Sequence, residues 1–111
     1  MEWINENASE YSARYTSAED AFLKEISDFT IGYHPDPGML SGQVQGKFLQ
    51  MISYMVRPYN VLEIGTLSGY SALCLAAGLQ PGGHLHTIEL REKDALIASE
   101  FIGKAGFSER I

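Results

Sequence analysis

The sequence predicts an α/β fold built on parallel strands, and three observations lead to this prediction. Residues 61–64 form a short apolar run that ends at Gly65, as expected of a buried strand. Residues 84–90 alternate toward a second strand. Each run is followed by a segment of helical pattern, 69–79 and 92–105. Strands that alternate with helices over short loops form right-handed βαβ units around a parallel sheet.

Two helices are expected before the first strand. Ser17 is a good helix cap, and apolar residues then recur at spacings of three and four as far as Phe29, so an amphipathic helix is predicted to end near Gly32. Two prolines make 34–38 a loop. A second helix is predicted over 42–57. Its expected apolar face consists of Val44, Phe48, Leu49, Ile52, Met55 and Val56.

The chain is predicted to contain an N-terminal helical segment, 1–35, and the first part of a larger α/β domain, 36–111. Residues 1–16, punctuated by Trp3 and two tyrosines, are expected to form a short helix or a docking arm. Only two strands are evident, although a parallel sheet normally has more strands and both faces covered. The segment therefore matches the first half of a doubly wound fold.

Composition excludes several classes of function. The formal net charge of −6 argues against a nucleic-acid-binding surface and against docking on anionic membranes. No apolar run approaches the length of a membrane span, and no signal-peptide pattern is visible, so a cytoplasmic protein is predicted. Cys74 is the only cysteine; it lies in an apolar run and is expected to be a buried hydrophobic residue.

The segment 62–71 contains the clearest chemical signal. A strand leads into a loop with glycines at 65 and 69, and that loop leads into a helix. Gly65 permits main-chain conformations that are closed to other residues, so a ligand can approach the backbone closely. Ligands of open α/β sheets bind at the carboxyl ends of the strands, where this loop is expected. The loop lacks the Gly-x-Gly-x-x-Gly pattern of dinucleotide sites and the Gly-Lys-Ser/Thr of phosphate loops.

Glu89 is expected at the end of the second strand, 24 residues after Gly65. A carboxylate at that position can accept hydrogen bonds from both hydroxyls of a ribose. The alternative is a solvated carboxylate at a strand end. The combination with the glycine loop favours a site for a nucleoside-containing cofactor.

The pattern Glu63-x-Gly65-x-x-x-Gly69-Tyr70-Ser71, with Glu89 downstream and Met39-x-Ser41 upstream, resembles the S-adenosylmethionine-dependent O-methyltransferases of the catechol and caffeoyl-CoA type. The bacterial members are the most similar, and the resemblance runs from about residue 36 to the end. It implies a partial Rossmann-like methyltransferase fold, N-terminal helices followed by βαβα, that lacks the remaining strands. The residues that it implies for the cofactor are Met39, Ser41, Glu63, Gly65, Thr66, Gly69, Tyr70, Ser71, Glu89 and Leu90.

The resemblance also implies roles for these positions. Glu63 and Gly65 would line the methionine end of the cofactor, and Ser71 would hydrogen-bond its carboxylate with Tyr70 beside it. Glu89 would hold the ribose hydroxyls with Leu90 near the adenine, while Met39 and Ser41 would close over the cofactor. Two alternatives stay open: Ser41 as a simple helix cap, and Tyr70 as a core residue.

Two departures from the family pattern stand out. Arg91 occupies a position that is often acidic in the family. The metal-binding aspartates and asparagine of the family lie beyond the stretch that matches residue 111, so a divalent cation such as Mg²⁺ is expected only in a full-length protein. His84 and His86 alternate on one strand and are predicted to be strand residues, and His34 is predicted to lie in a loop.

The resemblance implies methyl transfer from S-adenosylmethionine to a catechol-like or phenolic hydroxyl, with a small aromatic substrate and a homodimeric protein. The 111 residues alone are expected to be inactive because the catalytic and metal-binding part would be missing. One alternative is a self-associating interaction module that binds no cofactor, because a two-stranded sheet leaves its edges unpaired. A nicotinamide-binding half-domain is a weaker alternative because the third glycine is absent.

Overall fold

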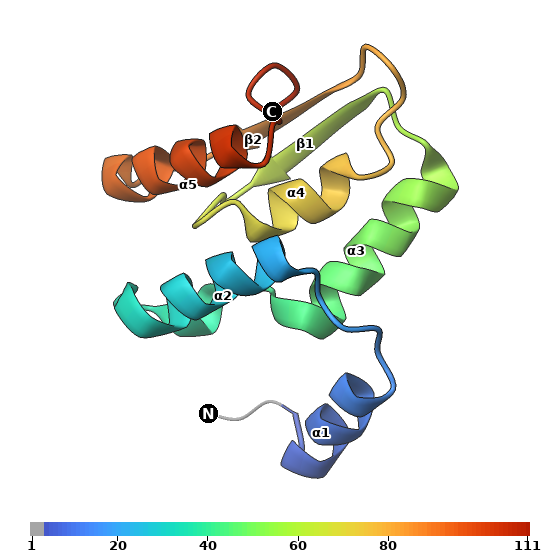
Figure 1. The fold of residues 1–111 in the computed structure, drawn as a ribbon, viewed down its shortest axis with the longest axis vertical. Helices are drawn as coiled ribbons and strands as arrows, with labels where there is room; N and C mark the ends of the chain where they lie inside the picture. Colours follow the sequence, from blue (N-terminus) through green and yellow to red (C-terminus); the bar gives the residue numbers. More distant parts are fainter. Residues whose placement is uncertain (1–3) are drawn as a thin grey trace.

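Two parallel strands form the sheet, as the sequence predicts. The computed structural model describes residues 4–111, so Trp3 lies outside the described residues. Figure 1 shows the order of elements, which agrees with the predicted order. The elements are α1 (Glu6–Arg14), α2 (Ala21–Tyr33), the 3-10 turn η1 (Pro37–Met39), α3 (Gly42–Val56), β1 (Asn60–Ile64), α4 (Tyr70–Ala76), β2 (His84–Ile88) and α5 (Glu92–Lys104).

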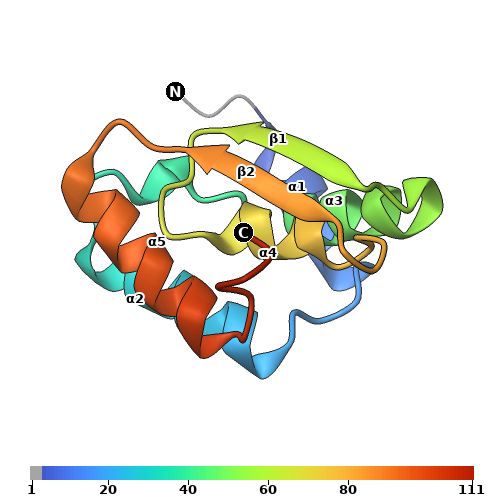
Figure 2. The same ribbon diagram turned by 90° about the horizontal axis from the view of Figure 1, so that it is seen from above.

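One face of the sheet is covered by helices and the other is open. Figure 2 shows α4 and α5 on the same side of the sheet, with α2 beyond them. The two strands pair so that Glu63 lies opposite Thr87. On the open side Leu62, Ile64 and Ile88 are 67%, 73% and 55% exposed. The sheet therefore has the one-sided cover of an incomplete α/β layer.

The core joins α2, α4 and α5. Its main cluster consists of Leu23, Ile26, Tyr70, Leu73, Cys74 and Phe101. A second cluster, Ala72, Ala76, Leu79 and Leu85, packs α4 against β2. The side chains of α2, which lies in the predicted segment 1–35, therefore share a core with residues beyond 36.

The predicted cap of the first amphipathic helix is wrong. Helix α2 begins at Ala21 rather than near residue 18, and its cap is Asp20, whose carboxylate accepts a hydrogen bond from the N–H of Leu23 over 2.8 Å. Asp20 is a strong N-cap. Residues between Tyr15 and Asp20 form a linker instead, and in it Glu19 accepts a hydrogen bond from the hydroxyl of Tyr70.

The predicted apolar face of the second helix is also wrong. Leu49 packs against the core, but Val44, Phe48, Ile52, Met55 and Val56 are exposed. The buried residues of α3 are Gly46 and Ser53. They face α4 at very short range, because a Cβ on Gly46 would lie 2.7 Å from Cε1 of Tyr70. Close approach of two helices selects small residues, and hydrophobicity alone does not reveal that selection.

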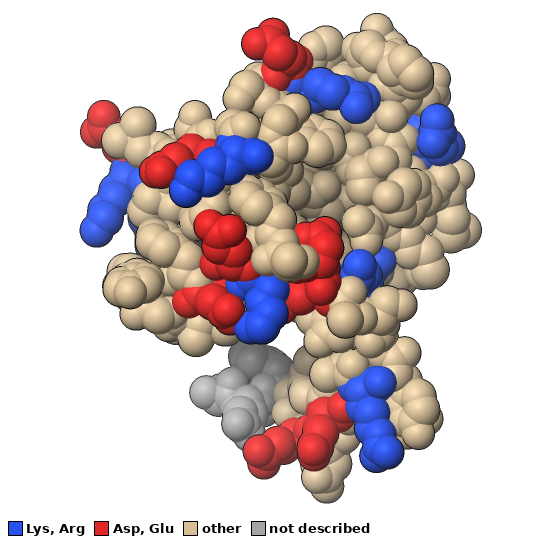
Figure 3. Space-filling model, in the orientation of Figure 1, with Lys and Arg blue, Asp and Glu red and all other residues tan. Residues whose placement is uncertain are grey.

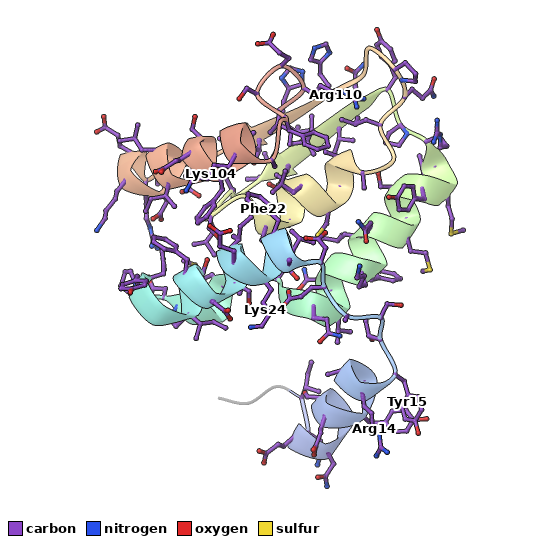
Figure 4. All side chains as sticks on the ribbon, in the orientation of Figure 1. Arg14, Tyr15, Phe22, Lys24, Lys104 and Arg110 are labelled. Atoms are coloured by element: carbon purple, nitrogen blue, oxygen red, sulfur yellow. The ribbon has the colours of Figure 1, made fainter. Side chains whose placement is uncertain are left out.

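Helix α1 lies at one end of the molecule (Figure 1). This confirms the helix alternative for the N-terminal segment, and none of its residues, all in the described range, is buried. Gln43 at the start of α3 donates hydrogen bonds to the carbonyls of Thr16 and Ser17, which follow α1. Figure 4 shows Arg14 and Tyr15 at the end of α1, where the guanidinium lies 5.9 Å from the tyrosine ring centroid.

Charged side chains of both signs are interspersed on the face shown in Figure 3, where Lys and Arg form no continuous patch among the residues described. Between Ile4 and Ile111, no helix is both long and apolar enough to cross a lipid bilayer. Cys74 is buried in the core, as predicted, and burial raises the pKa of its thiol to about 12.

Candidate functional site

A loop of unusual main-chain geometry connects β1 to α4. Gly65 and Gly69 have φ angles of +93° and +88°, in the left-handed region that glycine tolerates. Leu67, between them, has a φ of +52°, which is uncommon for a residue with a side chain. A Cβ on Gly65 would meet no described atom within 4 Å. The main chain at the carboxyl end of β1 is therefore open to a ligand.

Glu89 holds this loop from the neighbouring strand. It lies directly after β2, one residue beyond the strand end at Ile88. Its Oε2 accepts hydrogen bonds from the main-chain N–H groups of Thr66, over 3.2 Å, and Leu67, over 2.8 Å. Its Oε1 accepts from the N–H of Arg91 over 3.0 Å. The N–H groups, that of Arg91 most of all, lower the pKa of Glu89, so the group is an anionic acceptor at neutral pH.

Glu63 lies at the centre of a chain of hydroxyl groups. Its Oε2 accepts a hydrogen bond from Ser71 and its Oε1 accepts one from Thr87, each over 2.7 Å. The Thr87 hydroxyl also lies 2.6 Å from that of Thr66. Burial raises the pKa of Glu63, and the two hydroxyl donors oppose that shift. The register of the sheet produces this cluster, because it places Thr87 directly across from Glu63.

The loop, Glu89 and the turn before α3 enclose a crevice. A cavity of about 300 Å³ is lined by Met39, Ile64, Gly65, Leu67, Glu89, Arg91 and Asp94. A smaller cavity of about 70 Å³ is lined by Met39, Leu40, Ser41, Gly65, Thr66, Leu67, Ser68, Tyr70 and Ser71. Seven of the ten predicted site residues therefore line one or both cavities, and the crevice brings together two segments that are distant in sequence.

The remaining predicted site residues behave differently. Gly69 is buried, and a Cβ added to it would lie 3.4 Å from a side-chain carbon of Ile102. Leu90, the residue after Glu89, is 96% exposed. Glu63 lies below the crevice, where it orients Ser71. Tyr70 is 2% exposed and belongs to the main core, as the core-packing alternative expected. Its role beside a cofactor stays a prediction.

Two serines of the predicted site differ in how their hydroxyl groups are used. Ser41 precedes α3, yet its side chain makes no capping hydrogen bond to any residue that the structure describes. The capping alternative is therefore not supported, and Ser41 lines the smaller cavity. The Ser71 hydroxyl donates to Glu63. A hydroxyl has one proton to donate, so Ser71 would have to turn away from Glu63 to donate to a cofactor carboxylate.

The residues of the crevice fit a nucleoside cofactor with an aminoacyl arm. The ionised carboxylate of Glu89 accepts three hydrogen bonds from the main chain and has about four acceptor positions in all. It can therefore still accept from a ribose hydroxyl. The open main chain at Gly65 provides room for the arm. Oδ2 of Asp94 is buried without a hydrogen-bond partner among residues 4–111, so the crevice wall holds a further unused acceptor.

The comparison with known families agrees with this geometry. The family model described as O-methyltransferase matches residues 10–111. The chain belongs to the O-methyltransferase family. The match begins before residue 36, where the motif resemblance starts, and so includes α2 and most of α1.

Two catechol O-methyltransferases are among the similar proteins. Those of Niastella koreensis and Mycobacterium tuberculosis are each 40% identical to this O-methyltransferase chain over 67 residues. Each match covers 60% of this chain and 30% of the relative. The matched part of the chain is therefore a minor part of either relative.

Solved structures of methyltransferases share the fold of this O-methyltransferase chain. An O-methyltransferase from Bacillus cereus in complex with SAH has a TM-score of 0.81 and 36% identity, covering 94% of this chain and 47% of its own. An SAH-bound methyltransferase from Podospora anserina has a TM-score of 0.86 and 27% identity, covering 99% and 49%. The chain thus spans about half the length of these structures, and the Rossmann-like methyltransferase fold is confirmed.

Several residues that shape the site were not predicted from the sequence. Leu67, Thr87 and Asp94 all contact predicted site residues or line the crevice. The left-handed Leu67 and the buried Asp94 have no signal in residue type. Thr87 could have been found from the strand register. Within residues 4–111 no group of three or more His, Cys, Asp or Glu side chains is arranged to hold a metal, and the rings of His84 and His86 stack 6.5 Å apart on β2.

Proposed function

We propose that this chain forms the S-adenosylmethionine-binding part of an enzyme that methylates a catechol-like or phenolic hydroxyl. The observation that carries the proposal is the clamp between Glu89 and the main chain of the Gly65–Gly69 loop. It presents an ionised acceptor beside open backbone at the carboxyl ends of both strands, which is where ligands of α/β sheets bind. The catechol O-methyltransferases among the relatives support the class of substrate.

Each residue of the crevice has a role in this proposal. Glu89 accepts a ribose hydroxyl at its remaining acceptor position, and the exposed side chain of Leu90 packs on the adenine. Gly65 and Thr66, with Glu63 below them, line the methionine end. Met39 and Ser41 close the crevice from the turn before α3. Gly69 and Tyr70 set the path of the loop into α4, and Ser71 turns from Glu63 toward the methionine carboxylate.

When bound, the cofactor supplies an electrophilic methyl group. The residues of this chain would bind and orient it and shield it from water. The divalent cation that the family resemblance implies finds no three-ligand group among the described residues, so no catalytic step is assigned to it here. We propose that the chain of 111 residues binds cofactor but does not turn over a phenol, and that the whole protein is cytoplasmic and homodimeric.

Titration calorimetry with S-adenosylhomocysteine tests the binding proposal. The unsubstituted chain should bind, and Glu89→Ala should lose at least tenfold in affinity because it removes both the ribose acceptor and the clamp on the loop. Glu92→Ala is the matched control, since Glu92 is an exposed acid in the first turn of α5. An equal loss in both variants, or no binding by a folded chain, contradicts the proposal. Methyl transfer to catechol with Mg²⁺ present is expected to be absent.

A second candidate function is self-association without cofactor. The open sheet face, with Leu62, Ile64 and Ile88 exposed, favours it because apolar surface of this kind recruits a partner. A sizing column run beside the calorimetry separates the two: a dimer without binding heat favours self-association. A nicotinamide cofactor is disfavoured because the loop lacks the third glycine, and titration with NADH provides its test.

A further inference from the structure

His34 occupies a buried position between the end of α2 and the start of α5. Its Nε2 lies 3.1 Å from Oδ1 of Asp94, and both side chains are 7% exposed. Its Nδ1 accepts a hydrogen bond from the main-chain N–H of Asp36 over 2.9 Å. Both ring nitrogens are thus engaged, one with each of two segments that are nearly 60 residues apart in sequence.

The two contacts determine the proton position on the ring. A main-chain N–H can only donate, so Nδ1 must be the unprotonated acceptor and Nε2 must carry the proton that it donates to Asp94. The imidazole is therefore neutral and has a single tautomer. The sequence predicted only a loop residue at this position.

The turn that His34 holds leads directly to the crevice. Asp36 directly precedes η1, and its carbonyl accepts a hydrogen bond from the N–H of Met39 over 3.2 Å. Met39 lines both cavities of the crevice. Asp94 itself also lines the larger cavity. The contacts of His34 therefore connect two segments that line one crevice.

We propose that His34 is a positioning residue of this crevice, which uses its neutral Nε2–H form to join Asp94 to the turn at Asp36 and so holds Met39 and Ser41 over the glycine loop. This inference rests on the proposed function only for the identity of the ligand. The histidine itself touches no reacting atom. Its effect is to reduce the ordering that the turn must undergo when a cofactor binds, and preorganisation of this kind raises affinity.

An exposed ion pair runs beside the histidine but does not replace it. Nη1 of Arg91 lies 3.2 Å from Oδ2 of Asp36 and 3.7 Å from Oδ2 of Asp94. The side chains of Arg91 and Asp36 are about half exposed, and ion pairs at such positions contribute little to stability. The buried contact from His34 to Asp94 is the stronger connection, because losing one partner leaves a buried polar group unsatisfied.

A double-mutant cycle tests the inference with two readouts. The variants are His34→Ala, Asp94→Ala, both together, and Asp94→Asn, which keeps an oxygen for the Nε2–H. We expect each alanine to weaken S-adenosylhomocysteine binding about tenfold, the change that one lost hydrogen bond produces. The double variant should be no weaker than either single one, because the two residues act as a unit. Asp94→Asn should lose less affinity than Asp94→Ala, whereas the control His84→Ala, at an exposed histidine outside the crevice, should bind like the unsubstituted chain.

Amide hydrogen exchange in the ligand-free chain is the second readout. His34→Ala should speed exchange at Asp36, Met39 and Leu40 while leaving the α4 amides protected. If His34→Ala lowers the helix content measured by circular dichroism, His34→Gln provides a second variant. The glutamine amide can reach Asp94 but offers no acceptor at the Nδ1 position. Exchange at the Asp36 amide should therefore still rise. Nitrogen NMR shifts should show protonation at Nε2 alone.

Three results would overturn the inference: unchanged exchange in the turn, additive losses in the double variant, or a proton on Nδ1. If the unsubstituted chain does not bind S-adenosylhomocysteine, the proposed function of this chain fails. The exchange and NMR measurements on the ligand-free protein still decide the role of His34 in that case.

Discussion

The carboxylate of Glu89 accepts a hydrogen bond from the main-chain N–H of Leu67 over 2.8 Å, and Leu67 has a left-handed φ of +52°. The hydrogen bond to Glu89 accounts for the left-handed conformation of Leu67. A left-handed leucine is strained by about 1 kcal/mol, and it persists only where surrounding contacts impose it. The acid that is proposed to bind ribose therefore also maintains the shape of the loop that would receive the rest of the cofactor.

The first prediction concerns the effect of Glu89→Gln on stability at neutral and at acidic pH. The folded state lowers the pKa of Glu89 below the ordinary value of 4.5, so its stabilising contribution is present above 4.5 and is lost as the pH falls through the folded-state pKa. Urea unfolding at pH 7 should show Glu89→Gln to be less stable than the unsubstituted chain, and the gap should narrow as the pH falls below 4.5. A gap that is constant with pH would contradict an ionised clamp.

Glu63 is predicted to have the opposite pH dependence. Burial raises its pKa above 4.5, so the stability linked to its protonated form is present below 4.5 and is lost as the pH rises through the folded-state value. Glu63→Gln should therefore unfold at an equal or higher urea concentration at pH 7, since its amide can pair with the rotating hydroxyls of Ser71 and Thr87. A clear loss of stability at pH 7 would show that the charge itself is required.

Gly78→Ala is expected to separate α3 from the end of α4. A Cβ there would lie 2.1 Å from the carbonyl oxygen of Ser53, a main-chain atom that cannot move aside alone. Overpacking of this severity should lower the free energy of unfolding by about 3 kcal/mol or more. The matched control is Gly32→Ala in α2, where a Cβ would meet no described atom within 4 Å; it should raise stability by roughly 0.5 kcal/mol. Chemical denaturation of both variants gives the comparison.

Tyr70→Phe should loosen the linker before α2. The Tyr70 hydroxyl donates to Oε2 of Glu19 over 2.5 Å, and burial together with that carboxylate raises the pKa of Tyr70. Loss of the bond should cost about 1–2 kcal/mol of unfolding free energy. Tyr54→Phe is the control because Tyr54 is 54% exposed on α3. Equal stability of the two variants in thermal unfolding would show that the contact contributes nothing.

Local chemistry explains which parts of the site could be predicted from the sequence. Glycine can adopt the left-handed angles at 65 and 69, and an acid one residue past a strand end must lie near the neighbouring loop. Both signals involve a few adjacent residues. Most of the predicted site residues line the crevice, and their roles toward a cofactor stay predictions.

Side-chain partners across the fold could not be predicted in this way. Apolar periodicity suggested that Phe48 and Ile52 are inward, but the small residues Gly46 and Ser53 face α4 instead. Ser17 and Asp20 are both good caps, and the contact between Glu19 and Tyr70 goes with a helix that starts after Asp20. His34 and Asp94 gave no shared signal, because they are 60 positions apart and meet only when α2 packs against α5.

The sequence alone predicted the alternation of strands and helices, the glycine loop and the acid beside it. Each of these features depends on backbone preferences over a few neighbouring positions. Three other features became evident only in the tertiary structure: the buried face of α3, the tautomer of His34 and the chain of hydroxyl groups around Glu63. These features depend on which side chains are brought within 3 Å of each other, and separation along the chain does not specify that distance.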